Sequence, residues 1–558
     1  IGLTVRTGSG CTTAANILEM EKADFPRLED VKYKAEPFFK SLDSTRYKIA
    51  SAYSSKNYKR FISIKVSDLI SAYFLRMTLL QATSFVLGQT KSDISRAKVR
   101  EVLSKGSFSR SFAKKGVLKS ISDKILNHCS DVELTEAESR KFFSFMKIIR
   151  KFTVDFKDEL RKLDNGLYIA VYQAAGNSIR RTGGVQANYE SLSFEPESVF
   201  HLPETINRSI KNIRRISPDG TFVVIDAIRN PYEAKYFKDR YSAFYLMSIN
   251  APNEDRKSYL QNVHKYTVDE FDKLERRESG KTAISDADFI SQNVKKCIEI
   301  SDIHIFNPRN ELDNNNVLKA QLAWYLALMQ HPGLITPTSL ERVMQIAYTA
   351  KVNSGCISRQ VGAVVTDGNY SVKSVGWNDV AKGQVPCGLR SLQGLESNFD
   401  EVTYSQYERN NKEFRVAAKA ELIKIDGKPG TAGKNLAYCF KDIKNSLDSA
   451  GNQVHTRSLH AEENAFLQLA KYGSAGIEGG KLFTTASPCE LCAKKAYQLG
   501  IKEVVYIDPY PGIALDHIIS IGNNSPSLIQ FRGAVGKGYH QLYEPTISYK
   551  DELNYLKG

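Results

Sequence analysis

The sequence predicts an α/β fold built from at least two domains, and three observations support this prediction. With 558 residues, the chain is too long for a single hydrophobic core. Short apolar runs rich in β-branched residues alternate with stretches of helical periodicity, which is typical of sheets covered by helices. A glycine-containing loop at residues 8–10 follows the first apolar run, and such loops place a phosphate at the carboxyl edge of a parallel sheet.

The composition is that of an ordinary globular protein, with 42% hydrophobic and 25% charged residues. No apolar run approaches the roughly 20 residues that cross a bilayer. The chain does not open on a secretory pattern, so we expect a cytoplasmic protein without a membrane partner. The eight cysteines are too scattered for a disulfide framework, and only Cys489 and Cys492 are close in sequence.

The first predicted domain covers residues 1–335 and contains a basic helical insertion around residues 51–150. Stretches such as residues 66–87 carry apolar side chains at helical spacing. The insertion holds 19 Lys and Arg against 8 Asp and Glu, an excess that accounts for most of the net charge of +15. We therefore expect a polyanion to bind there, although basic helical faces are often only solvated surface.

Three buried parallel strands are predicted in the same domain from apolar, β-branched runs. They lie at residues 221–228, 243–249 and 302–307. A helical connector over residues 316–333 then leads to the domain boundary, which Pro337 and its neighbouring hydroxyl residues indicate.

The second predicted domain covers residues 336–558 and repeats the α/β pattern. A helix over residues 340–352 precedes a strand over residues 361–366. The chain turns polar around residues 388–435, which predicts an insertion with its own helix and a mobile loop. A further strand-like run occupies residues 481–487.

The strongest chemical signal lies in the second domain. His460, Cys489 and Cys492 offer one imidazole and two thiolates, which are three ligands of a tetrahedral zinc with the fourth position open for water, as in catalytic sites. Glu462 lies two residues after the histidine and is suited to carry protons. Each motif alone is often a structural half-site or a solvated helix. The H-x-E pattern followed by P-C-x-x-C is the signature of zinc nucleobase deaminases.

The loop at the start of the chain resembles a phosphate-binding loop with two departures. Val5 occupies the position of the first glycine, and Cys11 occupies that of the lysine. Backbone amides and a helix N-terminus still bind phosphate without the lysine, but transfer of a phosphoryl group requires another cation. The residues predicted to bind a nucleotide are Gly8, Ser9, Gly10, Cys11, Thr12, Thr13, Asp226 and Arg229.

The run that contains Asp226 resembles the corresponding part of nucleotide kinases. In those enzymes an aspartate at a strand end holds Mg²⁺ through water, and arginines neutralise the phosphates. Asp226, Arg229 and Arg180 take these places by resemblance. Simple helix capping is the alternative for the aspartate.

Residues 344–366, MQIAYTAKVNSGCISRQVGAVVT, resemble the opening of deoxycytidylate deaminases. The resemblance implies that Asn378, after the next strand, contacts the sugar of the substrate; a turn residue is the alternative. Tyr510 is predicted to border the pocket or stack on the base, with ordinary packing as the alternative. A second, structural zinc is open as an alternative and would use Cys356, Cys387 and His455.

The whole chain resembles the antiphage deoxycytidylate deaminases of the Avc type. This resemblance implies a degenerate P-loop kinase-like domain with a parallel sheet, followed by a cytidine-deaminase-like α/β/α domain. It also implies deamination of dCTP and dCMP to deoxyuridine nucleotides, which depletes cytidine nucleotides during phage replication. A small inhibitory RNA is the implied regulator. A homo-oligomer is expected by analogy with other deaminases.

Three other functions are compatible with the sequence. The basic region and the zinc motif also suit a cytidine deaminase that edits nucleic acids. The glycine loop suits a bifunctional nucleotide kinase and deaminase. A nucleotide-controlled binding protein with an inert deaminase domain is disfavoured because all four zinc-site residues are present.

Overall fold

The computed structural model describes residues 1–90, 94–106, 117–127, 133–217, 220–264, 267–268, 271, 289–309, 315–397, 400–451, 455–473, 475–508 and 514–557. It divides into two compact units. The first contains Ile1–Thr336 together with Gln541–Gly558, and the second contains Pro337–His540. The end of the chain, which the sequence assigned to the second domain, thus groups with the first unit. No helix of the described residues is long and apolar enough to span a bilayer.

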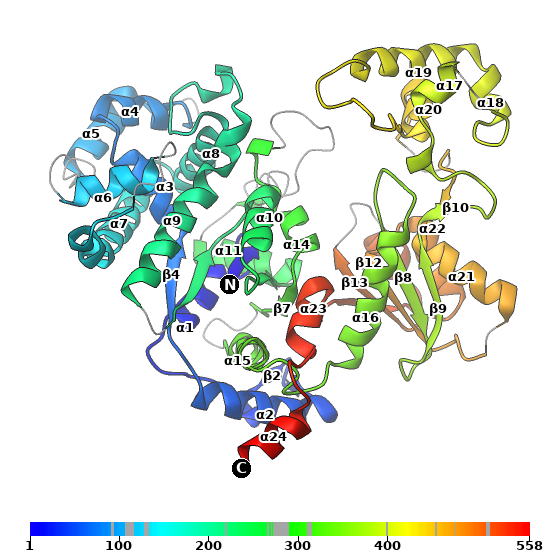
Figure 1. Ribbon diagram of the computed structural model, residues 1–558, viewed down its shortest axis with the longest axis horizontal. Helices are drawn as coiled ribbons and strands as arrows, with labels where there is room; N and C mark the ends of the chain where they lie inside the picture. Colours follow the sequence, from blue (N-terminus) through cyan, green and yellow to red (C-terminus); the bar gives the residue numbers. More distant parts are fainter. Residues whose placement is uncertain are drawn as a thin grey trace. The chain divides into compact units, whose positions relative to one another are not determined.

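The first unit is organised around a parallel sheet in the order β7-β6-β1-β5-β4 (Figure 1). Its strands are β1 (Gly2–Val5), β4 (Phe61–Lys65), β5 (Phe222–Asp226), β6 (Leu246–Asn250) and β7 (Ile303–Phe306). Leu3 of β1 pairs with Asp226 of β5 on one side and with Met247 of β6 on the other. The loop after β1 therefore lies at the carboxyl edge, where the connections turn to opposite sides of the sheet. The three strands predicted within residues 221–307 are all present.

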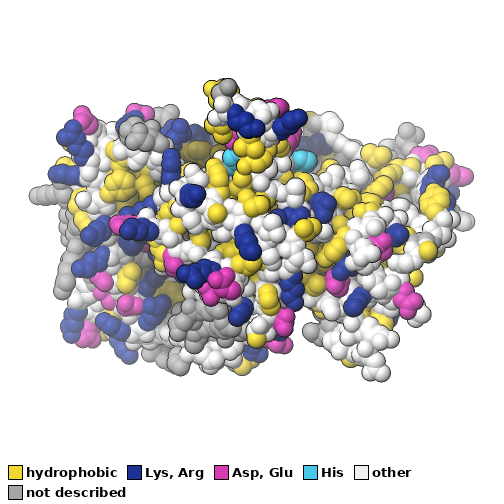
Figure 2. All heavy atoms as spheres, turned by 90° about the horizontal axis from the view of Figure 1, so that it is seen from below, with side chains coloured by type: hydrophobic (Ala, Val, Ile, Leu, Met, Phe, Trp, Pro, Cys, Tyr) yellow, Lys and Arg dark blue, Asp and Glu magenta, His cyan; other side chains and the backbone are white. Residues whose placement is uncertain are grey.

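The basic region around residues 51–150, predicted as a helical insertion, contains helices and also one strand of the central sheet. Its residues 61–65 form β4 and pair in register with β5, so they belong to the central sheet. Residues 66–87 form two helices, α3 (Val66–Phe74) and α4 (Leu79–Leu87), because Thr78 starts a new helix with a capping box. On the face shown in Figure 2, Lys and Arg side chains lie among acidic and hydrophobic ones and do not merge into one basic patch.

Helices of the first unit bury a long apolar stripe of α7 (Glu136–Leu163). The stripe repeats at spacings of three and four residues, so it stays on one helix face. Its members are Phe142, Phe145, Ile149, Phe152 and Phe156. Other helices of this core are α3, α4, α5 (Arg96–Lys105), α6 (Val117–Leu126), α8 (Leu167–Thr182), α9 (His201–Ile216) and α10 (Pro231–Arg240).

The predicted connector is an integral helix of the first unit. It forms α15 (Asn316–Gln330), which is buried over most of its length and packs against α2 (Leu42–Lys56). Phe39, just before α2, stacks on Trp324 of α15 with ring centroids 5.5 Å apart. The almost continuous apolar sequence of α15 is explained by this burial.

The second unit is a sheet between two helical layers (Figure 1). The strand order is β14-β13-β12-β8-β9, where β8 is antiparallel to both of its neighbours. The bounds are β8 (Gly362–Thr366), β9 (Val372–Trp377), β12 (Lys481–Ala486), β13 (Glu503–Asp508) and β14 (Ser527–Gln530). Alternate residues face opposite layers: Val364 and Phe483 pack against α16 (Ser339–Ala350), whereas Val365 and Leu482 pack against α21 (Ala461–Tyr472).

The polar insertion contains more ordered structure than the sequence predicted. Its helices are α17 (Leu392–Ser397), α18 (Gln406–Asn410), α19 (Lys412–Ile425) and α20 (Phe440–Leu447), which Figure 1 draws together in yellow. They enclose a small core of their own around Phe414 and Phe440. The insertion is thus a folded subdomain that extends beyond residue 435.

Candidate metal centre and substrate cavity

Three potential metal ligands converge in the second unit. The ligand atoms of His460, Cys489 and Cys492 all lie within 4.8 Å of one another. The His460 Nδ1 atom is 3.2 Å from the sulfur of Cys489 and 3.4 Å from that of Cys492. Both cysteines are buried. One imidazole and two thiols fit a zinc ion, and three ligands leave a position open.

Two helix starts bring these ligands together. His460 is the residue before α21, and Cys489 is the residue before α22 (Glu490–Gln498), with Cys492 in the first turn. The α21 helix lies close to β9 because Gly376 has no side chain: a Cβ atom there would lie 2.2 Å from the Ala461 carbonyl oxygen. Asn464 secures the contact by donating a hydrogen bond of 2.9 Å to the Trp377 carbonyl.

The polar surroundings favour a thiolate at the centre. Hydrogen bonds from Cys492 and His460 lower the pKa of Cys489 to about 4, although burial opposes this change. The same contact with Cys489 raises the pKa of His460. A thiolate is the form of cysteine that binds metals, so the donor chemistry agrees with the geometry.

Glu462 lies beside the ligands without being one of them in the described cluster. It is 4% exposed, and burial raises the pKa of its carboxyl group. The Thr484 hydroxyl donates a hydrogen bond of 3.1 Å to Glu462 Oε1. A buried carboxylate with one oxygen engaged and a raised pKa is a suitable proton carrier.

A cavity of about 430 Å³ opens onto this centre. Its wall includes His460, Glu462 and Cys489 on the metal side. Asn378 also lines the cavity, but its side chain is already hydrogen-bonded to the backbone. Val361 N–H donates a hydrogen bond of 2.7 Å to Asn378 Oδ1, and Asn378 Nδ2 donates one to the Arg359 carbonyl. The volume is in the range of small-molecule sites.

Comparison with known proteins agrees with this geometry. Residues 337–508 match the cytidine and deoxycytidylate deaminase zinc-binding region. The deoxycytidylate deaminase of Enterobacteria phage T2 is 32% identical over 169 residues, which make up 30% of this chain and 79% of that protein. The chain belongs to the deoxycytidylate deaminase family. It is therefore an enzyme of the hydrolytic deaminase class.

More distant members of the family are also similar to this chain. The deoxycytidylate deaminase of Schizosaccharomyces pombe is 26% identical over 232 residues, or 41% of this chain and 53% of that protein. A crystal structure of dCMP deaminase from the cyanophage S-TIM5 in complex with dCMP and dUMP aligns with 34% of this chain and 94% of that chain. Its sequence identity is 22% and its TM-score is 0.20.

The other residues predicted for the deaminase site have different placements. Tyr510 lies outside the described residues. Cys356, Cys387 and His455 line the cavity, but in the described part of the chain they do not converge as the metal ligands do. His455 instead lies 3.2 Å from Asp448.

The loop of the first unit that was predicted to bind a nucleotide joins β1 to α1 (Cys11–Leu18). Gly8 and Gly10 have positive φ angles of 91° and 104°, and α1 begins directly after them, with Thr12 and Thr13 in its first turn. The Thr12 hydroxyl donates 3.1 Å to Asp226 at the end of β5. The structure thus brings the loop and the strand-end aspartate together.

The surroundings of this loop differ from those of a lysine-containing loop. The Cys11 thiol is buried, and burial followed by the charge of Asp226 raises its pKa, so it supplies no charge. Arg229 donates a hydrogen bond of 3.2 Å to the Thr7 hydroxyl, and Arg256 donates one of 3.2 Å to the Thr7 carbonyl, so cations lie beside the loop. Arg180 is instead paired with Glu233 at 2.7 Å in the interior.

Sequence reasoning missed three features of the deaminase site. Thr484 donates a hydrogen bond to Glu462. It lies in a strand, where threonine is common, so the sequence does not indicate this role. Arg359 forms an ion pair with the buried Asp508, far away in sequence. A cluster of charged residues from the insertion also lines the cavity. No pattern in the sequence relates such partners, because only the fold makes them neighbours.

Proposed function

We propose that this chain is a zinc-dependent hydrolase that deaminates free deoxycytidine nucleotides, dCMP and dCTP, to deoxyuridine nucleotides. One observation carries the proposal: three zinc-type donors converge beside the buried Glu462 in the wall of a cavity of about 430 Å³. The similarity to the deoxycytidylate deaminase of phage T2 supports the choice of substrate class.

The residues of the centre have different proposed roles in the hydrolysis. His460, Cys489 and Cys492 would hold zinc, which supplies a water molecule activated at neutral pH when it is bound. Glu462 accepts a proton from water at its free carboxylate oxygen and delivers it to N3 of the cytosine ring. Water oxygen replaces the amino group at C4, and a second proton leaves with that group as ammonia. Thr484 keeps Glu462 oriented for both transfers.

For the first unit, we propose a P-loop kinase-like domain that binds a nucleotide with Mg²⁺ and regulates the deaminase. Support comes from the parallel sheet with β1 in its middle and from the glycine loop at its carboxyl edge. Because Cys11 is neutral, it cannot stabilise the charge of a transferring phosphoryl group. We therefore propose nucleotide binding without phosphoryl transfer. The resemblance to Avc-type proteins extends the proposal to antiphage defence in the cytoplasm, a homo-oligomer and an inhibitory small RNA.

The test uses the zinc-loaded full chain with a mixture of deoxy- and ribonucleotides, analysed by mass spectrometry. We expect dUMP and dUTP to form from dCMP and dCTP. Single-stranded DNA and RNA are incubated in parallel and sequenced for C-to-U changes. Editing of the polymers with unchanged free nucleotides would replace this proposal with the nucleic-acid editor.

A further inference from the structure

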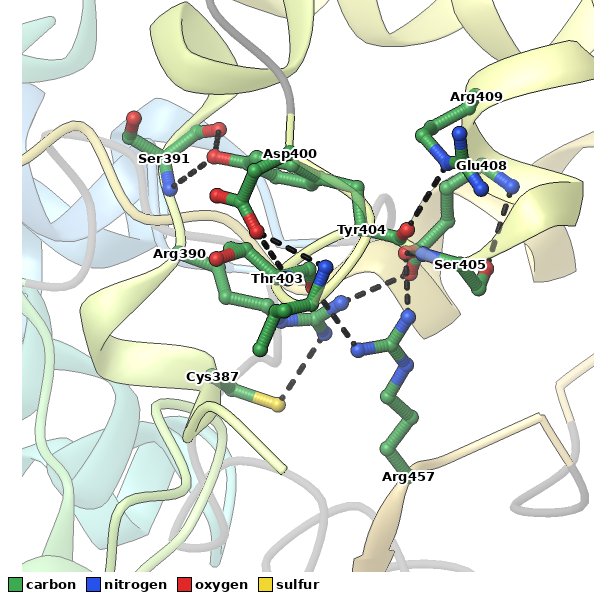
Figure 3. Close-up of polar contacts among 11 residues, drawn as sticks. Cys387, Arg390, Ser391, Asp400, Thr403, Tyr404, Ser405, Glu408, Arg409 and Arg457 are labelled. Carbon is green, nitrogen blue, oxygen red and sulfur yellow. Dashed lines mark hydrogen bonds and ion pairs between the residues drawn. The ribbon is translucent and has the colours of Figure 1, made fainter. Parts of the chain in front are cut away.

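Three charged residues of the insertion and its return strand form a compact group in the cavity wall. We define Arg390, Glu408 and Arg457 as the arginine–glutamate cluster (Figure 3). Glu408 accepts hydrogen bonds from both arginines, at 2.8 Å from Arg390 Nη1 and 2.5 Å from Arg457 Nη2. The side chain of Arg390 is 2% exposed, that of Glu408 7%, and that of Arg457 21%. Arg457 is therefore the member that remains accessible from the cavity.

The cluster carries one positive charge more than its carboxylate neutralises. The other Lys and Arg residues in the cavity wall each have an acidic partner of their own: Arg359 pairs with Asp508, Lys441 with Asp442 and Lys444 with Asp448. In the cluster, two guanidinium groups share one carboxylate. A charge removed from water is costly unless it is paired, so the surplus indicates a missing anion.

The hydrogen-bond donors of the cluster are also incompletely used. Arg390 Nε is buried and has no hydrogen-bond partner. Each guanidinium has five N–H donors. Arg457 uses donors on Glu408 and on the Thr403 carbonyl, 3.1 Å away, and others remain. Planar guanidinium groups with free donors suit the oxygens of phosphate.

The cluster has the right separation from the metal centre for one nucleotide. Arg457 precedes His460 by three residues, with β11 (Ser458–Leu459) between them, and three residues of chain span at most roughly 10 Å. This length is comparable with that of a nucleotide between its base amino group and its phosphate. Both ends line the same cavity.

We propose that Arg457, held in place by Glu408 and Arg390, binds the phosphate groups of the nucleotide substrate. This inference rests on the proposed function and adds the residue that selects nucleotides over nucleosides. Glu408 is a positioning residue: it also accepts 2.8 Å from the Ser405 N–H at the start of α18, so it fixes Arg457 to the insertion. The insertion thus supplies the phosphate end of the site.

The test compares kcat/KM for deoxycytidine, dCMP and dCTP on the zinc-loaded full chain. We expect Arg457→Ala to lower kcat/KM for dCMP and dCTP by about tenfold or more, with a change of less than about twofold for deoxycytidine. Arg457→Lys keeps the charge and recovers part of the loss. Arg409→Ala is the matched control, because Arg409 contacts Glu401 and the Tyr404 carbonyl and does not line the cavity.

Two results would overturn this assignment. Equal losses with deoxycytidine and dCMP would make Arg457 a purely structural residue, and no loss with either nucleotide would remove it from the site. Calorimetric titration with inorganic pyrophosphate measures phosphate binding without deamination. It therefore tests the phosphate site independently of the proposed reaction. The loop of the first unit is expected to bind pyrophosphate in both chains, so the number of binding sites is compared. Loss of one site in Arg457→Ala supports the phosphate site even if no substrate is deaminated, and an unchanged number of sites and affinities contradicts it.

Discussion

At the scale of single residues, Glu462, the proposed proton carrier, contacts an uncharged neighbour, Thr484. The single proton of the Thr484 hydroxyl is shared between Glu462 Oε1, 3.1 Å away, and the Ala486 carbonyl oxygen, 2.7 Å away. Thr484 is fully buried, so water cannot replace its hydrogen bond without rearrangement. We therefore expect a residue of β12 to help orient the carboxylate that we propose to be catalytic.

Thr484→Val is expected to lower kcat for deoxycytidylate deamination by about tenfold. Valine has nearly the same shape but leaves Glu462 Oε1 without this donor. Steady-state kinetics with measured zinc content checks the expectation. Thr485→Val is the control, because Thr485 accepts a hydrogen bond from Gly362 N–H and does not contact Glu462. Equal kcat values in the two variants would show that the Thr484 hydroxyl does not orient the carboxylate.

At the same scale, the sequence predicted residues whose spacing is dictated by chemistry. Two short motifs at the starts of α21 and α22 contain these residues, so their positions can be read from the sequence. They are His460, Glu462, Cys489 and Cys492. The arginine–glutamate cluster could not be predicted, because its members come from three separated segments and contact one another only in the folded insertion.

At the scale of elements, the start of α7 shows how a buried carboxylate stabilises a helix. Glu138 closes a capping box with Thr135 and also accepts hydrogen bonds from Lys124 at 2.7 Å and Ser120 at 2.5 Å. Burial opposes ionisation, but these contacts from Lys124, Ser120 and Thr135 outweigh it and lower the pKa of Glu138 from 4.5 to about 2. Its ionised form therefore ties α6 to α7.

Glu138→Gln is expected to destabilise the first unit by about 1–2 kcal/mol at pH 7. The folded pKa lies below the unfolded one, so the stabilisation is present above about pH 4.5 and is lost as the pH falls toward 2. Thermal unfolding from pH 7 to pH 3.5 should show the gap between wild type and variant narrowing below about pH 5. The exposed Glu136→Gln serves as control. A gap that stays constant over this range would contradict the account.

The elements that were predicted correctly are those whose burial requires a long run of apolar residues. The strands β5, β6 and β7 are continuous apolar runs because both faces of a parallel sheet are covered. The strand β4 was missed because its five residues follow a basic stretch and lead directly into α3. The helices of the insertion were missed because their core is small and their surface is polar.

At the scale of the whole molecule, the three proposed metal ligands all belong to one unit. His460, Cys489 and Cys492 all lie within Pro337–His540. A ligand that binds the folded state stabilises the part of the chain that forms its site. Zinc is therefore expected to stabilise the folded state of the second unit.

Removal of zinc by a chelator is expected to lower the unfolding temperature of the second unit by roughly 5 °C or more. The transition of the first unit should stay in place. Differential scanning calorimetry of the full chain, before and after chelation and after zinc is restored, measures both. Equal shifts of all transitions would mean that the two units unfold cooperatively.

In the proposed reaction, Glu462 and a zinc held by His460, Cys489 and Cys492 deaminate deoxycytidylate. The most direct measurement is the rate of dUMP formation from dCMP by the wild-type chain and by Glu462→Gln, each with its zinc content determined. We predict that the wild type forms dUMP and ammonia in equal amounts. The variant should retain zinc and be slower by about a thousandfold. A zinc-loaded Glu462→Gln chain as active as the wild type, or a zinc-loaded wild type that leaves dCMP and dCTP unchanged, would contradict the claim.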